Sequence, residues 1–390
     1  MSAFRIGVVG LGDISDVYVN NLKKYPDIVQ VTAVAARRAE VAAAFARRHA
    51  ITKNYATGYE LIADPDVDIV LNLTPPDAHR DLNLAALAAG KHVYTEKPLG
   101  ATFDEGCRII ELAARKGLRV ASAPDTFLGG RLQTCRRLID DGTLGRVIGA
   151  GAFVADHGHE WFHPNPDFFY QPGAGPLHDI GPYYLTAMLS LFGPIVRCCG
   201  MTSRAFNERT IESEPFRGTT ISVNVDTHMT GTYEFANGAL ATILASFDVW
   251  DSELPRLEIY GTKGTICLND IDPIDGPNLF GGNVLLRTRE NYRWKDLPRP
   301  QQHSDWTRVL IEHRFNEVSQ RENSRGIGLV DLALAIRNNR PERASGAMAL
   351  HSLEAMDGLL TSARERRFYD LATTFDLPEP LPVNFPDNER

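Results

Sequence analysis

The stretch RIGVVGLGDIS, residues 5–15, decides the fold of the first part of the chain. Its apolar run Arg5–Val9 has the length and composition of a buried strand. Gly10 and Gly12 end this run, and a helical pattern of apolar residues follows at Ser15–Lys24. A strand, a glycine-rich turn and a helix in this order predict the first unit of a parallel sheet with crossover helices.

The alternation of short apolar runs and helical patterns continues to about residue 123. Gly90 and Gly117 end two of the helical patterns, and Thr102 with Glu105 has the spacing of a capping box. Crossover connections of this kind build a Rossmann-type, doubly wound parallel sheet. Further strands are expected at Val29–Ala35, Ile69–Leu73, His92–Thr95 and Leu118–Ala121, and further helices at Ala39–His49, Asp77–Ala89 and Thr102–Lys116.

After about residue 145 the strand signals follow one another without helices between them. Val225–Phe235 alternates between apolar and polar residues, turns at Asn237-Gly238 and returns through Leu240 to Leu244, which predicts a hairpin. A second hairpin is expected at 257–268. We therefore expect α/β plus α+β architecture, with a C-terminal open, mostly antiparallel sheet over about 146–290. Flanking helices are expected at Tyr183–Phe192, 306–321, 327–338 and 346–364, followed by a polar tail.

The composition argues against several classes of protein. The 390 residues include 41 Lys and Arg against 49 Asp and Glu, and the net charge of −8 makes a nucleic acid a poor partner. No apolar segment approaches the roughly 18 residues that cross a membrane, and the first residues lack the pattern of a signal peptide. The five cysteines form no C-x-x-C pair, so neither a disulfide framework nor a zinc site is expected. A soluble protein of a reducing cytoplasm is the simplest interpretation.

The loop after the first strand has the context of a dinucleotide fingerprint, G-x-G-x-x-G between a strand and a helix. Gly10 permits the tight turn, Gly12 lets backbone N–H groups approach a pyrophosphate, and the start of the helix supplies partial positive charge. Ser15 replaces the third glycine but is small enough for the helix to pack closely on the strand. A plain glycine turn is the alternative. The expected cofactor-binding residues here are Gly10, Gly12, Asp13, Ile14 and Ser15.

The second strand ends without the acidic residue that binds the ribose 2′-hydroxyl of NAD in such folds. Arg37 and Arg38 stand there instead, and guanidinium groups suit a 2′-phosphate better than a diol. We therefore expect NAD or NADP as the cofactor, with NADP slightly favoured. In the alternative interpretation the two arginines only solvate the start of the next helix.

Two further loops end strands at the same edge of the expected sheet, where ligands of open α/β sheets bind. Asn72–Pro76 follows the third strand and Tyr94–Pro98 the fourth. Lys97 precedes a proline, which restricts its backbone, and its ammonium group could bind a substrate hydroxyl near a nicotinamide. A surface lysine beside Glu96 is the alternative. Further cofactor contacts are expected from Thr74, Pro75, His79, Glu96, Lys97 and Asp125.

Three segments carry a family resemblance. The loop at residue 10 reads G-x-G-x-x-S, residues 96–98 read EKP, and residues 175–184 read GPLHDIGPYY. Over nearly the whole chain this resembles the glucose-fructose oxidoreductase / inositol dehydrogenase / MocA family. The resemblance implies an NAD(P)-dependent enzyme in which Lys97 is catalytic, often beside a cis peptide bond, and Asp179 and Tyr183 supply the remaining acid and base groups. Many members carry His in place of Tyr183, and the tyrosine form resembles glucose-fructose oxidoreductase and dihydrodiol dehydrogenase.

These three implied residues form a chemically coherent set. Hydride removal from a secondary alcohol needs a base for the hydroxyl proton and a positive group for the developing alkoxide. Tyr183 with Lys97 can supply both, and Asp179 can orient the lysine or bind a neighbouring hydroxyl. Because a phenol is a weak acid, the Lys97 cation is needed to activate Tyr183. The alternative for Asp179 is an N-cap of the helix that begins near Pro182.

The loop Asp156–His163 carries three histidines, His157, His159 and His163. Their flanking carboxylates suggest a metal site, but hydride transfer of this type needs no metal and we expect none. We favour a sugar-binding loop, in which Trp161 offers a ring face and the histidines offer hydrogen bonds; plain loop structure is the alternative. The expected substrate-binding residues are Lys97, His157, His159, Trp161, His163, His178, Asp179 and Tyr183.

The chain is too long for one hydrophobic core. We expect an NAD(P)-binding domain at 1–123, a substrate-binding and oligomerisation domain at 124–375, and a tail at 376–390. The leading hypothesis is an oxidoreductase acting on a secondary hydroxyl of a sugar, glycoside or cyclitol. The alternatives are an NAD-dependent glycoside hydrolase, which oxidises C3 transiently and recycles its bound NAD, and a non-catalytic dinucleotide sensor. The open sheet and the habit of relatives favour a homodimer or homotetramer, with no nucleic acid or membrane partner.

Overall fold

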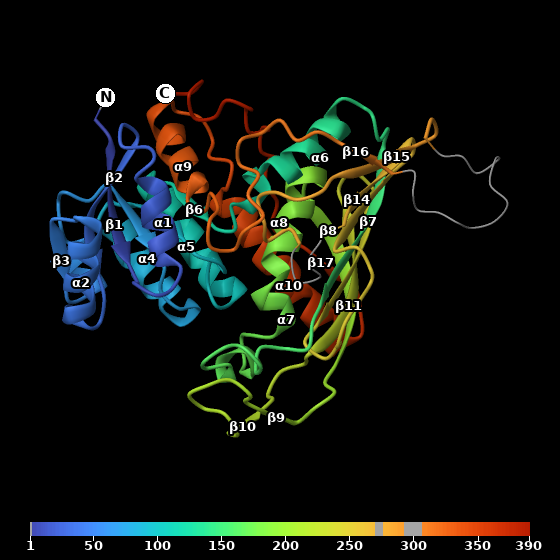
Figure 1. Ribbon diagram of the computed structural model, residues 1–390, viewed down its shortest axis with the longest axis horizontal. Coiled ribbons are helices and arrows are strands. Elements are labelled where there is room, and N and C mark those ends of the chain that lie inside the picture. Colours follow the sequence, from blue (N-terminus) through green and yellow to red (C-terminus); the bar gives the residue numbers. More distant parts are fainter. Residues whose placement is uncertain (1, 270–275, 292–305) are drawn as a thin grey trace. The chain divides into compact units, whose positions relative to one another are not determined.

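The computed structural model describes residues 2–269, 276–291 and 306–390, and the chain divides into two compact units (Figure 1). The first unit comprises Met1–Gly129, Glu317–Leu353 and Pro378–Arg390. The second comprises Gly130–Asn316 and Glu354–Leu377. Both units are therefore discontinuous in sequence, and the first one includes two segments from late in the chain.

The first unit contains a fully parallel, six-stranded sheet in the order β3-β2-β1-β4-β5-β6. This is the strand order of the Rossmann fold, so that prediction is confirmed. The order reverses between β1 and β4, and the Gly10 loop and the Thr74 loop follow these two strands. The strands are β1 (Phe4–Val9), β2 (Val29–Ala35), β3 (Lys53–Tyr55), β4 (Ile69–Asn72), β5 (His92–Thr95) and β6 (Val120–Ser122).

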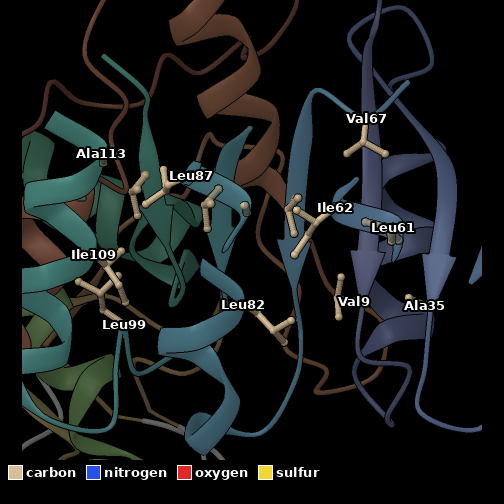
Figure 2. Close-up of a cluster of buried hydrophobic side chains, with 14 of the residues drawn as sticks. Val9, Ala35, Leu61, Ile62, Val67, Leu82, Leu87, Leu99, Ile109 and Ala113 are labelled. Atoms are coloured by element: carbon tan, nitrogen blue, oxygen red, sulfur yellow. The ribbon is translucent and has the colours of Figure 1, made fainter. Parts of the chain in front are cut away.

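A cluster of buried apolar side chains packs helices against this sheet (Figure 2). It includes Val9 from β1, Leu82 from α4 and Ile109 from α5, and Leu350 from the late segment joins it. Full burial of each such side chain stabilises the fold by about 1.5–3 kcal/mol. The helices of this unit are α1 (Ser15–Leu22), α2 (Ala39–His49), α3 (Gly58–Ile62), α4 (His79–Ala88), α5 (Phe103–Lys116) and α9 (Ile327–Arg337), with short 3₁₀ turns at Pro76–Ala78 and Thr126–Leu128.

The second unit is built on a nine-stranded sheet in the order β16-β15-β14-β13-β7-β12-β11-β8-β17. The two predicted hairpins are present as β11–β12 and β13–β14. β12 runs parallel to β7, and the other neighbouring pairs in the described part of this sheet are antiparallel, so the sheet is mixed. Its strands are β7 (Val147–Ala155), β8 (Ile195–Ser203), β11 (His228–Phe235), β12 (Leu240–Ser246), β13 (Leu257–Gly261), β14 (Gly264–Leu268), β15 (Leu285–Thr288), β16 (Thr307–Arg308) and β17 (Tyr369–Asp370).

Helices flank one face of this mixed sheet. Gly200 of β8 and Gly231 of β11 leave room for Leu359 of α10, because a Cβ at either glycine would lie less than 3 Å from that leucine. The predicted fold class, a Rossmann-type parallel sheet followed by a second sheet with flanking helices, is therefore confirmed. The remaining elements are α6 (Gly130–Asp140), α7 (Pro176–Asp179), α8 (Gly181–Phe192), α10 (Gly346–Glu365), a 3₁₀ turn at Asp167–Tyr170 and a small sheet of β9 (Glu208–Thr210) and β10 (Thr220–Ser222). No helix of the described ranges is long and apolar enough to span a membrane.

The helix predicted at 306–321 is wrong. The segment contributes the short edge strand β16 and then runs as irregular chain. Leu310 and Val318, which contributed to the apparent helical pattern, are 76% and 64% exposed, so no apolar helix face is buried. The backbone bonds elsewhere, since the Phe315 carbonyl accepts from the Gly130 N–H at 2.6 Å. The helices predicted at 327–338 and 346–364 are confirmed as α9 and α10.

Candidate functional site

The glycine loop after β1 has the geometry that a pyrophosphate site requires. Gly10 has φ +93°, and a Cβ there would lie 2.6 Å from the Leu73 carbonyl carbon, so only glycine fits. A Cβ at Gly12 would meet no atom within 4 Å, which leaves open space over the loop. Ile14 is the N-cap of α1 and provides no side-chain cap, so no side chain at this position competes for the first N–H groups. These residues fit a bound dinucleotide.

Ser15 explains how the loop tolerates the loss of the third glycine. Its side chain is fully buried, and its hydroxyl donates to the Gly12 carbonyl at 2.5 Å. The hydroxyl is therefore satisfied inside the loop rather than left without a partner against the strand.

Lys97 follows β5 in a turn that is held by hydrogen bonds to the Glu96 carboxylate. One carboxylate oxygen of Glu96 accepts from the Tyr18 hydroxyl at 2.6 Å, and the other accepts from the Lys97 backbone N–H at 3.0 Å. Tyr18 is fully buried, and burial together with the Glu96 charge raises its pKa well above the usual range, so it stays a donor. The peptide bond between Lys97 and Pro98 is cis. The lysine side chain is half-buried.

His79 joins the two loops at the carboxyl edge of the sheet. Its Nδ1 lies 2.7 Å from the Pro98 carbonyl oxygen and its Nε2 lies 2.7 Å from the Thr74 carbonyl oxygen. The ring is fully buried, and burial lowers the pKa of His79. Both ring nitrogens thus face backbone atoms, and the residue links the Thr74 loop to the Lys97 turn.

Asp125 has a similar internal contact in the first unit. One of its carboxylate oxygens accepts from the backbone N–H groups of Gly326, at 2.8 Å, and Gly328, at 3.0 Å. These groups belong to the start of α9, where a carboxylate is favourable. Burial raises the pKa of Asp125. The carboxylate therefore attaches the late segment Glu317–Leu353 to the Rossmann sheet.

In the second unit, Asp179 lies at the end of α7, and Ile180, not Asp179, is the N-cap of α8. The Asp179 Oδ2 atom lies 3.0 Å from Nε2 of His159, in a contact whose two side chains are only 14% and 10% exposed. Tyr183 follows in the first turn of α8 and is buried. The capping interpretation of Asp179 is therefore not supported, and its carboxylate faces an imidazole.

The other candidate residues of this unit have separate partners. His157 stacks on Trp250, with ring centroids 3.4 Å apart and planes at 14°. His178 Nε2 lies 3.0 Å from Asp357 Oδ1. His163 Nδ1 accepts from the Asn165 N–H at 3.1 Å, and Trp161 is exposed. In the described part of the chain, no group of three or more His, Cys, Asp or Glu residues is arranged to hold a metal ion.

A buried charge cluster lies behind the loop that carries His159, and sequence reasoning did not predict it. The Arg209 guanidinium donates to one carboxylate oxygen of Glu160 and to Asp248, and the three side chains are less than 10% exposed. It also donates to the carbonyls of His157, at 2.9 Å, and Phe247, at 2.7 Å. Glu160 lies in the histidine-rich loop, but nothing in the sequence around Arg209 indicates a buried arginine.

Comparison with known proteins decides the family. The model of an oxidoreductase family described as having an NAD-binding Rossmann fold matches residues 4–123, and the GFO/IDH/MocA C-terminal domain matches residues 132–267. The chain belongs to the GFO/IDH/MocA oxidoreductase family. The predicted family resemblance is thereby confirmed, and residues 4–123 form the NAD-binding Rossmann domain of this family.

Characterised GFO/IDH/MocA relatives include two dehydrogenases. Trans-1,2-dihydrobenzene-1,2-diol dehydrogenase of Bos taurus is 34% identical over 194 residues, 49% of this chain and 56% of that protein. Levoglucosan dehydrogenase of Pseudarthrobacter phenanthrenivorans is 26% identical over 252 residues, 60% of this chain and 64% of that protein. The chain thus spans between half and two thirds of the length of these relatives.

Solved structures of the GFO/IDH/MocA family share the whole fold. A levoglucosan dehydrogenase in complex with NADH superposes with a TM-score of 0.80 at 20% identity, covering 95% of this chain and 100% of that one. An NAD-binding oxidoreductase from Klebsiella pneumoniae gives a TM-score of 0.80 at 19% identity over 96% of this chain and 100% of that one. At this identity the likeness establishes the fold.

The two glycines of the loop give a matched pair of predictions within this GFO/IDH/MocA domain. Gly10→Ala is expected to lower the free energy of unfolding by about 1–3 kcal/mol, because its positive φ and its contact with Leu73 both disfavour a side chain. Gly12→Ala is expected to leave stability nearly unchanged but to weaken NADH binding, since its Cβ would fill the open space. Urea denaturation and NADH fluorescence titration measure the two effects, and equal stability losses in both variants would contradict this assignment.

Proposed function

We propose that this protein is an NAD(P)-dependent oxidoreductase that transfers hydride between a nicotinamide and a secondary hydroxyl of a sugar, glycoside or cyclitol. The observation that carries the proposal is the position of Lys97, two residues after the end of β5 in a sheet of the order 3-2-1-4-5-6. Ligands of such sheets bind outside the carboxyl ends of the strands. The names of the relatives, dehydrogenases of a cyclic diol and of levoglucosan, support a substrate with ring hydroxyls.

When bound, the cofactor supplies a nicotinamide ring that accepts or donates hydride. We assign to the Lys97 ammonium the stabilisation of negative charge on the substrate oxygen, and to Tyr183 the transfer of the hydroxyl proton. In the oxidative direction the substrate C–H bond breaks with loss of hydride, the O–H proton leaves to the base, and a carbonyl forms. Asp179 orients these groups. The motif match at residues 96–98 and 175–184 supports this division of roles.

For the cofactor, Gly10, Gly12 and the start of α1 fit the pyrophosphate. Arg37 and Arg38 follow β2 after Ala36, and both side chains are exposed, so they are accessible to a ribose 2′-phosphate. We propose on this ground that the protein accepts NADP and slightly prefers it. The test is the ratio of kcat/KM for NADP to that for NAD, and a strong preference for NAD would contradict the proposal.

The experiment that tests the function is a panel of sugars, glycosides and cyclitols, assayed with NAD and with NADP, together with native mass spectrometry of the purified protein. Accumulation of free NADH or NADPH with one class of substrate is the expected result. Release of an aglycone with a retained, recycled dinucleotide would instead identify a glycoside hydrolase. Dinucleotide binding with no turnover of any member of the panel would favour a sensor.

We also propose that the protein forms a homodimer or homotetramer through the outer face of the nine-stranded sheet. The register places Met201, Thr230, Leu240 and Thr242 on the face opposite to the side where Leu359 packs, and Met201 and Leu240 are 78% and 56% exposed. Sedimentation is expected to show a dimer or tetramer, and Met201→Glu with Leu240→Glu is expected to yield monomer. A wild-type species of 43.2 kDa alone at micromolar concentration would contradict this.

A further inference from the structure

The contact between His159 and Asp179 assigns a partner to the acidic residue of the site. Nε2 of His159 lies 3.0 Å from the Asp179 carboxylate oxygen. Two lone pairs at this distance would repel each other, so the contact favours the form of His159 that carries a hydrogen on this nitrogen. An imidazole from the loop after β7 thereby faces the carboxylate at the end of α7.

The His159 ring is packed among aromatic side chains. It packs against Phe169, with centroids 3.9 Å apart, and edge-on against Phe247 at 4.8 Å. Its Nδ1 is buried and has no hydrogen-bond partner in the described part of the chain. The residue is 8% exposed. The ring thus contacts aromatic side chains on its faces and the Asp179 carboxylate through Nε2.

The buried charge cluster fixes the backbone at His159. The His159 N–H donates to the Tyr170 hydroxyl at 3.3 Å, and that hydroxyl donates to Glu160. Arg209 holds Glu160 on the other side and also binds the His157 carbonyl. Since the loop is bonded both at His157 and at Glu160, the imidazole between them has little freedom to turn away from Asp179.

We propose that His159 is a positioning residue that holds the Asp179 carboxylate ionised and correctly oriented, and that Arg209 and Glu160 hold His159. This inference rests on the proposed function, in which Asp179 orients the reacting groups. Asp156 is a further titratable group in this region, and the charges of His159, Asp179 and Arg256 act on its carboxyl. Burial raises the pKa of Asp156, and the Asp179 charge acts in the same direction, so a second carboxylate opposes the ionisation that His159 supports.

The test compares His159→Phe, which keeps the ring, with His159→Gln, whose side-chain N–H can reach the carboxylate. His159→Phe is expected to lower kcat by about 10–100-fold with little change in KM for the cofactor, because small misplacements of a catalytic group have effects of this size. The acidic limb of the pH–kcat profile should move to higher pH, since the carboxylate loses a group that favours its charged form. His159→Gln should recover most of the activity, and His313→Phe, the same change elsewhere in the second unit, should match the wild type.

The outcomes separate this inference from the proposed function. An unchanged kcat and pH profile in His159→Phe, with Lys97→Ala inactive, would overturn the positioning role. A loss of activity with an unmoved pH profile and no recovery in His159→Gln would also overturn it. If the wild type turns over no substrate of the panel, the proposed function fails, and a double-mutant cycle of His159→Phe and Asp179→Asn in urea denaturation still tests the contact. Additive effects in that cycle would contradict it.

Discussion

Lys97→Ala is expected to lower kcat by about 10²–10⁴-fold on whichever substrate the panel identifies, the range typical for loss of a positioned acid–base group. The backbone of this turn is held by Glu96 and Tyr18, so removal of the side chain should leave the turn in place. The fluorescence titration with NADH should therefore change much less than kcat. Stopped-flow measurement of hydride transfer locates the loss in the chemical step.

The control for this variant is Lys116→Ala, which removes an exposed lysine in the last turn of α5 in the same unit. It is expected to retain wild-type kcat and NADH affinity. Wild-type activity in Lys97→Ala would contradict the catalytic role of the lysine. A variant that fails to bind NADH would indicate a role in cofactor binding instead.

Arg209→Met is expected to be the most destabilising single change in the second unit, at about 3–5 kcal/mol. The substitution leaves Glu160 and Asp248 buried with their positive partner removed, and a buried uncompensated charge is far more costly than the loss of a surface pair. Urea denaturation followed by circular dichroism gives the change in the free energy of unfolding. The double variant with Glu160→Gln should recover part of the loss.

The matched control is Arg137→Met, which makes the same substitution but breaks an exposed ion pair, that of Arg137 with Asp141 at 3.6 Å. Surface pairs contribute about 0–1 kcal/mol, so this variant should be close to the wild type. If Arg209→Met were as stable as Arg137→Met, the buried cluster would not stabilise the His159 loop.

The sequence predicts the strands and helices of the first unit well, because the periodicity of its apolar residues and the glycines that end each pattern indicate the same boundaries. Apolar runs ending in Gly10 or Asn72 are strongly buried, and their pattern is unambiguous. β3 and α3 were not predicted, since they have only three and five residues and their short patterns do not show a period. The apparent helix at 306–321 failed for the opposite reason, because its apolar residues share a spacing but not a buried face.

The sequence predicts the residues of the candidate site, but not the side chains that contact them. Motifs identify Lys97, Asp179 and Tyr183 one by one, but no local pattern connects Asp179 with His159, twenty residues earlier, or Glu160 with Arg209. Such contacts depend on which loops lie next to each other in the folded protein. Local sequence propensity does not determine this, because packing and the burial of charges bring together residues that are far apart in the sequence.

The discontinuity of the first unit has a consequence for how the chain acquires its structure during synthesis. Asp125 can accept from the Gly326 N–H only after Gly326 has been synthesised. Buried Asp331 pairs with Arg343, and Arg343 also pairs with Glu389 near the end of the unit. At ~5–20 residues per second, the roughly 260 residues between Gly129 and Glu389 take about 10–50 s to emerge. The first unit therefore contains both the first-synthesised and the last-synthesised residues of this sequence. The apolar cluster beside the Rossmann sheet therefore lacks Leu350 until the late segment has been made.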